Sequence, residues 1–376
     1  MSIAFIDLAT QQAQIKDKID QRIQNVLAHG KYILGPEVAA LEKKLAKFSN
    51  VKHAIGCANG TDALLLALMA FKVRVGEAIF CPSFTFSATA EVIPCMGAVP
   101  YFVDVDEKTF NMDINSLKNA ISEAKAAQLK PSGIIPVDLF GLPADYDPIE
   151  EIARLEDLWI LADSAQGYGG NYKGRITGSI GDIATTSFFP AKPLGCYGDG
   201  GAVFTDDDDL AELITSYRLH GKGGHKYNNE RIGMNSRLDT IQAAILLEKL
   251  AIYADEIEKR QSVAERYIKG IENPALETPH IPGDIKSVWA QFTLKAESEK
   301  SRDFIMASLK EQNIPSVVYY PLPLHMQTAY KAFPVSGNGL PVSESLAEIV
   351  FSLPMHPYLE TDTQDKIISV INSVKT

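Results

Sequence analysis

Short apolar stretches alternate with helical ones through the first half of the chain, and this alternation restricts the fold more than any other feature. Strands are expected at Ala54–Ala58, Ala78–Pro82, Val99–Val103, Gly133–Leu139, Trp159–Ala162 and Ala184–Phe189. Helices are expected between them, at Asn59–Phe71, Ser87–Met96, Ile114–Ala127 and Pro148–Leu155. Short apolar strands separated by helices are typical of βα units. The pattern therefore predicts an α/β fold with a mostly parallel central sheet and helices on both of its faces.

The pattern differs on either side of this region. Two helices are expected before it, at Asp7–Leu34 and from Glu37 to about Phe48. After it, a long helix is expected to begin near Ser236, because Ser236 and Asp239 resemble a capping box. Further strands are expected at Trp289–Leu294 and Ser316–Tyr320, and helices at Arg302–Gln312 and Thr363–Val374. We therefore predict a large α/β domain over residues 1–248 and a smaller C-terminal α+β domain over residues 249–376.

Composition excludes several classes of protein. The net charge is −11 and no run of lysines or arginines stands out, which disfavours binding to a nucleic acid polymer or a membrane surface. The longest apolar run, Ala63–Phe71, is too short to span a bilayer. The first residues show no basic segment followed by an apolar one, so no signal peptide is expected. The four cysteines form no C-x-x-C pair, which is typical of a reducing compartment. We expect a cytoplasmic protein.

The segment Ser187–Gly201 holds a single lysine between two prolines. A β-type run stops at Pro190, Lys192 follows, and a glycine-rich loop leads into a second β-type run at Ala202–Thr205. Schiff-base chemistry needs a positioned amine with a lowered pKa, and glycines let the backbone approach a bulky ligand closely. The segment fits a lysine that meets an aldehyde cofactor. It fits an exposed lysine on a β-hairpin loop about as well, because short motifs often match by chance.

A carboxylate and an amide follow another expected strand. Asp163 ends the apolar run Trp159–Ala162, and Gln166 comes three residues later. A carboxylate at the carboxyl end of a buried parallel strand faces the crevice in which α/β proteins bind ligands. Pyridoxal phosphate (PLP) needs such a carboxylate to keep its ring nitrogen protonated, and Gln166 is a candidate partner for the ring hydroxyl. The alternative is an Asp that only begins a turn.

A phosphate site is predicted where the first helix of the alternating region begins. Asn59 is a plausible N-cap, and the free N–H groups of Gly60 and Thr61 would attract an anion, although an ordinary helix cap has the same sequence. Ser187, five residues before Lys192, is a candidate second phosphate ligand. Phe86 follows a buried strand and is the candidate to stack on the cofactor ring, but it also fits the core.

Signatures of other cofactors are absent from the sequence. There is no G-x-G-x-x-G after a strand, no G-x-x-x-x-G-K-[ST] and no H-E-x-x-H. The seven histidines show no ligand spacing, so no metal site is expected.

Five segments, in this order along the chain, resemble the DegT/StrS family of PLP-dependent sugar-nucleotide aminotransferases. They are Tyr32–Glu37, Asn59–Leu64, Asp163–Gln166, Ser187–Gly201 and Gly233–Asp239. The resemblance implies the aspartate aminotransferase fold (fold type I). Within the family, the Ser187–Gly201 segment and the ending Ser352–Leu359 are most similar to the WbpE-type enzymes, which aminate C3 of UDP-2-acetamido-2-deoxy-3-oxo-glucuronate. Family members with histidine at the lysine position are dehydratases, so Lys192 favours amino transfer.

The resemblance also implies roles for individual residues. Lys192 would be the Schiff-base lysine, Asp163 the partner of the ring nitrogen and Gln166 that of the ring hydroxyl. The phosphate would be held by Gly60, Thr61 and Ser187, and by Asn235 from the second subunit of a homodimer. The candidate substrate-binding residues are Arg237, Tyr319, Tyr320 and His325. Tyr319 stands where the WbpE type is expected to have histidine.

The predicted activity is transfer of an amino group from L-glutamate to a nucleotide-linked keto-sugar, for surface polysaccharide such as the O-antigen of lipopolysaccharide. Two alternatives remain open. One is amination of C3 or C4 of a dTDP- or UDP-linked 6-deoxy-keto-sugar. The other is a non-catalytic, PLP-binding regulatory protein on the same fold, which the joint presence of Lys192, Asp163 and Gln166 disfavours.

Overall fold

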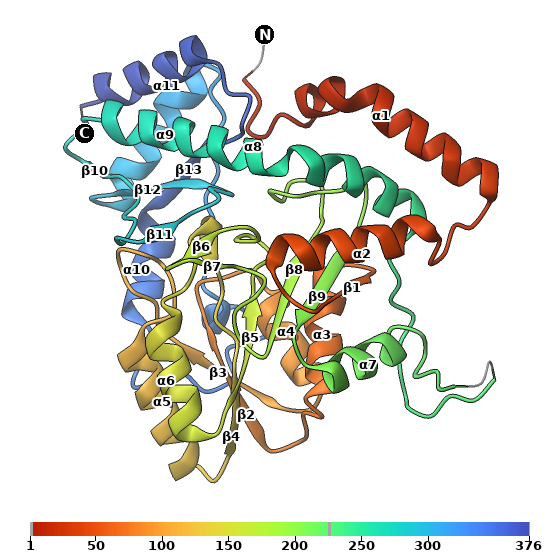
Figure 1. Ribbon diagram of the computed structural model, residues 1–376. Coiled ribbons are helices and arrows are strands. Elements are labelled where there is room, and N and C mark those ends of the chain that lie inside the picture. The colour runs from red at the N-terminus through yellow and green to blue at the C-terminus, as the bar shows by residue number, and fades with distance from the viewer. Residues whose placement is uncertain (1–2, 225–226, 376) are drawn as a thin grey trace.

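A computed structural model describes residues 3–224 and 227–375 of the 376-residue chain. Its centre is a seven-stranded sheet whose spatial order is β1-β9-β8-β5-β4-β2-β3 (Figure 1). In that order the strands are His53–Cys57, Gly201–Thr205, Ile183–Ser187, Trp159–Asp163, Lys130–Ile134, Glu77–Pro82 and Val99–Val103. Neighbouring strands from β8 to β3 are parallel, while β9 runs antiparallel to both β1 and β8. The predicted mostly parallel sheet is confirmed.

Successive side chains of a strand point to opposite faces of the sheet. Because the strands of this sheet carry apolar side chains on both faces, helices cover both. On one face, Ala54, Ala162 and Phe204 lie in a core that is shared with α2 (Pro36–Ser49), α5 (Ile114–Ala126), α6 (Tyr146–Glu156) and the start of α8 (Thr240–Gly270). On the other face, Ile55, Leu161 and Val203 pack with α3 (Gly60–Ala70), α4 (Ala88–Cys95) and α7 (Asp208–Tyr217). The carboxyl ends of the parallel strands thus meet at one rim of a layered α/β/α body.

A second, smaller core lies at the far end of the long helix α8. The three-stranded sheet β10-β12-β13 comprises Leu276–Glu277, Phe292–Ala296 and Val350–Leu353. It shares a core with the end of α8, α9 (Glu299–Glu311) and α11 (Thr361–Ser373). In Figure 1, α8 runs from the central sheet to this smaller group, and α1 (Leu8–His29) lies along the first part of α8.

The two cores are joined by more than α8. The short helices η2 (Leu324–Met326) and α10 (Pro341–Ile349) belong to the C-terminal part of the chain. Leu324 and Leu340 nevertheless pack in the core of the large sheet, and α10 packs with Phe84 and with η1 (Leu139–Gly141). The division at residue 248 remains a prediction, and that position lies inside α8.

Three local expectations from the sequence are wrong. The helix α8 begins at Thr240 with Asp239 as its N-cap, not at Ser236. Ser236 is buried and its hydroxyl accepts a hydrogen bond from the N–H of Ala58 (3.1 Å), so it does not cap a helix. The segment Ser316–Tyr320 is not a strand: only Val317 pairs, with Ser352, before the chain turns toward Pro321. The strand expected at Gly133–Leu139 ends at Ile134.

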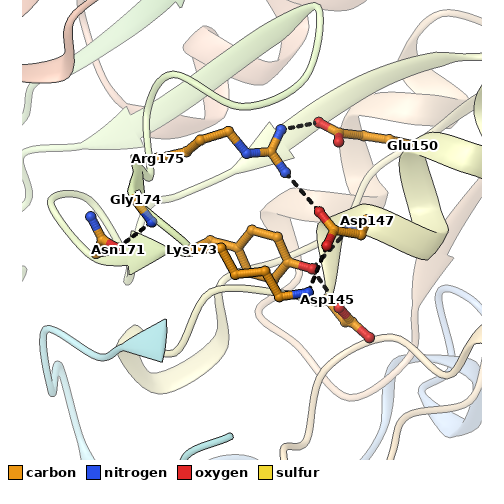
Figure 2. A network of polar contacts seen from close by, with 8 residues as sticks. Asp145, Asp147, Glu150, Asn171, Lys173, Gly174 and Arg175 are labelled. Carbon is orange, nitrogen blue, oxygen red and sulfur yellow. Dashed lines mark hydrogen bonds and ion pairs between the residues drawn. The ribbon is translucent and has the colours of Figure 1, made fainter. Parts of the chain in front are cut away.

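A small sheet ties the large body to the chain beyond α8. Its order is β11-β6-β7, in which β6 (Asn171–Tyr172) and β7 (Arg175–Ile176) form a hairpin and β11 is Ile285–Lys286. Figure 2 shows how the hairpin is held against α6: Arg175 bonds Glu150 (2.6 Å) and Asp147 (3.2 Å), and Lys173 also bonds Asp147 (2.6 Å). These ion pairs are exposed, so each contributes little to stability.

The buried Tyr172 supplies the stronger part of this attachment. Its hydroxyl donates to Asp145 (2.6 Å) and accepts from the N–H of Asp147 (3.0 Å). We expect Tyr172→Phe to lower the free energy of unfolding by about 1–3 kcal/mol, because both partners lose a hydrogen bond. Chemical denaturation measures this value. Lys173→Ala is the control: it removes the exposed ion pair with Asp147 and the contact of the ammonium with the Tyr172 ring (4.9 Å), and it should cost less than about 1 kcal/mol. Equal costs for the two variants would contradict the assignment.

No helix within residues 3–224 and 227–375 is long and apolar enough to cross a membrane.

Candidate active site

Lys192 lies in the connection between β8 and β9, at the carboxyl end of β8. The connection is tightly closed: the N–H of Lys192 donates to Phe189 O (2.9 Å), and the N–H of Cys196 donates to Phe188 O (2.7 Å). Lys192 is partly buried, so it is not a freely exposed hairpin lysine. Burial lowers the pKa of its amine, and the Asp163 carboxylate opposes that change. A lysine with a lowered pKa is a more available nucleophile and base at neutral pH.

Asp163 is the last residue of β5, the strand beside β8, and it is almost fully buried. One carboxylate oxygen accepts from the hydroxyl of Thr89 (2.7 Å) and the other from the N–H of Ala165 (3.1 Å). Burial raises the pKa of Asp163, and the two hydrogen bonds and Lys192 counteract it. Neighbouring parallel strands therefore bring the predicted lysine and carboxylate within electrostatic reach of each other.

The N-terminus of α3 lies against the end of β8. Asn59 caps the helix, since its side chain accepts from the N–H of Asp62 (2.8 Å). A Cβ added to Gly60 would lie only 2.7 Å from the Cβ of Ser187, so the two residues are in direct contact. The N–H groups of Gly60 and Thr61 have no partner within the helix. Backbone donors, a hydroxyl and the positive end of a helix dipole thus meet at one point, as an anion requires.

Gln166 and Tyr320 meet beside Asp163. The Gln166 side chain accepts from the N–H of Phe140 (2.9 Å) and donates to the hydroxyl of Tyr320 (3.0 Å). Tyr320 also lies near Phe86, with ring centroids 6.5 Å apart. Phe86 is exposed and has a free face, whereas the nearby Phe84 is fully buried in the core.

The other substrate candidates are arranged differently. His325 lies in η2, and its two ring nitrogens contact Ser83 Oγ (2.7 Å) and Glu344 Oε1 (3.1 Å), so a substrate would have to replace one of these partners. Tyr319 is half-buried against Phe5, with ring centroids 6.3 Å apart. Neither contact brings these two side chains to Lys192.

The segment with Asn235 and Arg237 lies near the N-terminus of α3. Ser236, between them, bonds the N–H of Ala58, the residue before Asn59. Asn235 is exposed and Arg237 is half-buried. Within residues 3–224 and 227–375, Arg237 has no carboxylate partner. An unpaired guanidinium beside a predicted anion site is available to an acidic ligand.

These residues fit PLP. The close approach of Gly60 to Ser187 forms a cradle for a phosphate. Asp163 is a buried carboxylate that forms no ion pair within the described residues, which suits a protonated ring nitrogen, and Lys192 lies within its electrostatic reach. A phosphate site, a carboxylate and a lysine amine are the three groups that a phosphorylated pyridine aldehyde needs from its protein.

Comparison with known proteins identifies the family. Residues 13–372 match the model of the DegT/DnrJ/EryC1/StrS aminotransferase family. The chain belongs to this family. It is 48% identical, over 96% of both chains, to the UDP-2-acetamido-2-deoxy-3-oxo-D-glucuronate aminotransferase of Pseudomonas aeruginosa. The aminotransferase is PLP-dependent, as the family is, and solved relatives include forms with bound PMP, the aminated cofactor.

Solved structures give the same fold. A DegT/DnrJ/EryC1/StrS aminotransferase from Brucella abortus superposes with a TM-score of 0.96 and 52% identity, covering 98% of each chain. DesV of Streptomyces venezuelae, solved with a ketimine intermediate, superposes with a TM-score of 0.93 and 35% identity, covering 99% of this chain and 98% of its own. The predicted PLP-transferase fold is thereby confirmed.

Sequence reasoning missed two residues of this aminotransferase that contact Asp163. Thr89 bonds the carboxylate from α4, 74 residues away in the chain. Asp138 lies beside Asp163 and donates its N–H to the Asp163 carbonyl (3.0 Å). The sequence has no signal for either contact, because both form only when strands distant in the chain become neighbours.

Proposed function

We propose that the protein transfers an amino group from L-glutamate to C3 of a UDP-linked 3-keto-sugar, most specifically UDP-2-acetamido-2-deoxy-3-oxo-glucuronate. The observation that carries this proposal is the meeting of Lys192, the buried Asp163 and the Gly60–Ser187 cradle at one rim of the sheet. The 48% identity to the Pseudomonas aeruginosa enzyme supports the choice of sugar. The product would serve surface polysaccharide synthesis, such as that of O-antigen, in the cytoplasm.

Each residue has a task in this reaction. Gly60, Thr61 and Ser187 would hold the cofactor phosphate, Phe86 would stack on the ring, and Gln166 would bond the ring hydroxyl. PLP supplies an aldehyde that condenses with amines and a ring that accepts electrons, provided that its nitrogen stays protonated. Asp163 would keep the ring nitrogen protonated, because a buried anion stabilises an adjacent cation strongly.

Lys192 would move the proton that the reaction transfers. Its amine takes the proton from Cα of glutamate as a general base and afterwards returns a proton as a general acid. The lowered pKa of Lys192 favours this role, since a larger fraction of the amine is neutral at physiological pH. In the second half-reaction the same amine supplies the proton to the carbon that becomes C3 of the amino sugar.

Mass spectrometry of the sugar products tests the proposal. The purified protein is incubated with glutamate carrying heavy nitrogen and, in separate reactions, with the 3-keto-uronate and with 6-deoxy-keto-sugars linked to UDP or dTDP. We expect heavy nitrogen in the amino-uronate. Preferred labelling of a deoxy-sugar would instead establish the alternative substrate class. Conversion of no sugar, and no amination of the cofactor by glutamate, would favour the regulatory alternative.

Arg237 is the proposed partner of the sugar carboxylate, together with Tyr319, Tyr320 and His325 as further contacts to the sugar nucleotide. Arginine offers a planar fork that fits a carboxylate, whereas lysine keeps only the charge. We expect Arg237→Lys to slow the uronate half-reaction by about tenfold or more, with a smaller effect on the glutamate half-reaction. Single-turnover absorbance measurements separate the two. Equal slowing of both would assign Arg237 to glutamate or to loop support.

A homodimer with shared active sites is also part of the proposal. Several apolar side chains are exposed around the site, among them Tyr32, Ile33, Phe86 and Phe189. Ile33 pairs with Asp239, close in sequence to the exposed Asn235. A second copy of the chain would cover these side chains and bring its Asn235 to the phosphate. We propose no role for a nucleic acid polymer or a membrane.

Subunit mixing tests whether Asn235 acts across the interface. We expect mixed Lys192→Ala and Asn235→Ala proteins to recover activity that neither has alone, because one site of each heterodimer keeps both wild-type residues. The matched control mixes Lys192→Ala with Asp163→Asn, whose defects lie in the same chain's half of the site. Activity in the control mixture, or none in the first mixture despite proven subunit exchange, would contradict sharing.

A further inference from the structure

Asp138 is a second buried carboxylate beside the proposed partner of the ring nitrogen. It follows β4, and the preceding Val137 pairs in parallel with Asp163. The backbone N–H of Asp138 donates to the Asp163 carbonyl (3.0 Å), and its side chain is fully buried. Within the part of the chain that the structure describes, no lysine, arginine or histidine forms an ion pair with Asp138.

Three hydrogen bonds hold the Asp138 carboxylate. One oxygen accepts from the N–H of Ala144 (3.0 Å) and the hydroxyl of Tyr146 (2.8 Å), and the other accepts from the hydroxyl of Ser164 (2.6 Å). Ser164 lies between Asp163 and the turn formed by residues 165–169. A Cβ added to Gly167 would lie 2.2 Å from the Cβ of Asp138, so this turn packs directly on Asp138.

The three hydrogen bonds alone do not explain why a carboxylate stands at position 138. A neutral asparagine could accept the same bonds from Ala144 and Tyr146, whereas a buried carboxylate without a cation costs more. Burial raises the pKa of Asp138 to about 6, the three donors oppose the rise, and the charge of Asp163 adds to it. The group is therefore mainly ionised above pH 6, where its charge favours any cation placed beside Asp163.

We propose that Asp138 is a positioning residue that fixes the turn from Asp163 to Gln166 and adds a second buried negative charge behind the ring nitrogen of the cofactor. This inference rests on the proposed placement of that nitrogen at Asp163. The charged and titratable groups that face Asp138 are Asp163 from β5 and Tyr146 from α6, and neither is a cation. The ring nitrogen of the cofactor would supply a positive charge that no described residue paired with Asp138 provides.

Asp138→Asn in the holoenzyme tests this inference, because it keeps the shape and removes the charge. Above pH 6 we expect the glutamate half-reaction to slow by about tenfold, the factor that corresponds to one pKa unit. We also expect the pH at which the cofactor's visible absorption changes to shift downward. Tyr146→Phe is the matched control: it removes one hydrogen bond and keeps the carboxylate, which stays ionised well above pH 6, so the absorption titration should shift less than in Asp138→Asn even if the thermal stability falls.

The outcomes separate the two levels of the proposal. Wild-type protein that converts its cofactor with glutamate, together with an unchanged titration and rate in Asp138→Asn, would overturn the role of Asp138 alone. Equal shifts in Asp138→Asn and Tyr146→Phe would also overturn it, because both would then report altered packing. A wild-type protein that does not react with glutamate would overturn the proposed function and this inference with it.

Discussion

Replacing Lys192 by alanine is expected to reduce turnover by about ten thousand-fold or more, because the variant loses both the amine that meets the cofactor and the proton carrier. The phosphate site is built from Gly60, Thr61 and Ser187, so the variant should still bind PLP. Steady-state rates and equilibrium dialysis with PLP measure the two properties separately.

The control for this variant is the same substitution at Lys249. Lys249 is buried on α8, and its ammonium lies over the ring of Tyr197 (4.4 Å). Lys249→Ala tests how much a buried lysine matters for stability near the same loop. Added primary amines should restore part of the activity of Lys192→Ala. The same amines should not increase the activity of Lys249→Ala. Substantial turnover by Lys192→Ala without added amine would refute its role.

Asp163→Asn has the second largest expected effect, a loss of about a hundred- to a thousand-fold in the glutamate half-reaction. The asparagine keeps the size of the side chain and can bond Thr89, but it has no charge to hold the proton of the ring nitrogen. Rapid mixing with glutamate, followed by cofactor absorbance, gives the rate.

Thr89→Val provides the graded comparison for Asp163→Asn. It removes one hydrogen bond that lowers the pKa of Asp163 and leaves the carboxylate in place. Its effect on the half-reaction should be much smaller than that of Asp163→Asn. If Asp163→Asn retains wild-type rates, the carboxylate is structural, and the assignment of the ring nitrogen to this residue fails.

The residues that sequence reasoning found share one property. Lys192 and Asp163 stand at the ends of apolar strands, and the parallel order of β5 and β8 places such ends at the same rim. Asn59 was recognisable as a cap because its partner, Asp62, is only three residues away. Local pattern and strand order were therefore enough to predict the fold class and the centre of the site.

The residues that it missed or misplaced depend on contacts between distant segments. Ser236 has the sequence of a helix cap, but its hydroxyl bonds Ala58, 178 residues away. Ser316–Tyr320 has the composition of a strand, yet the sheet edge accepts only Val317. Asp138 falls in the strand expected at Gly133–Leu139, but β4 ends at Ile134, and the pairing of β4 with β5 places Asp138 beside Asp163. The hydrophobic periodicity of a short segment cannot predict contacts of this kind.

Borohydride reduction of the PLP-loaded protein, followed by peptide mapping, tests the central claim most directly. The reduction makes the bond between cofactor and lysine permanent, so the labelled peptide identifies the lysine without any knowledge of the sugar substrate. We predict a pyridoxyl group on Lys192, in the peptide that contains Ser187–Gly201, and loss of that label when glutamate is added before reduction. A label on another lysine, or a label on Lys192 that glutamate does not displace, would contradict the account.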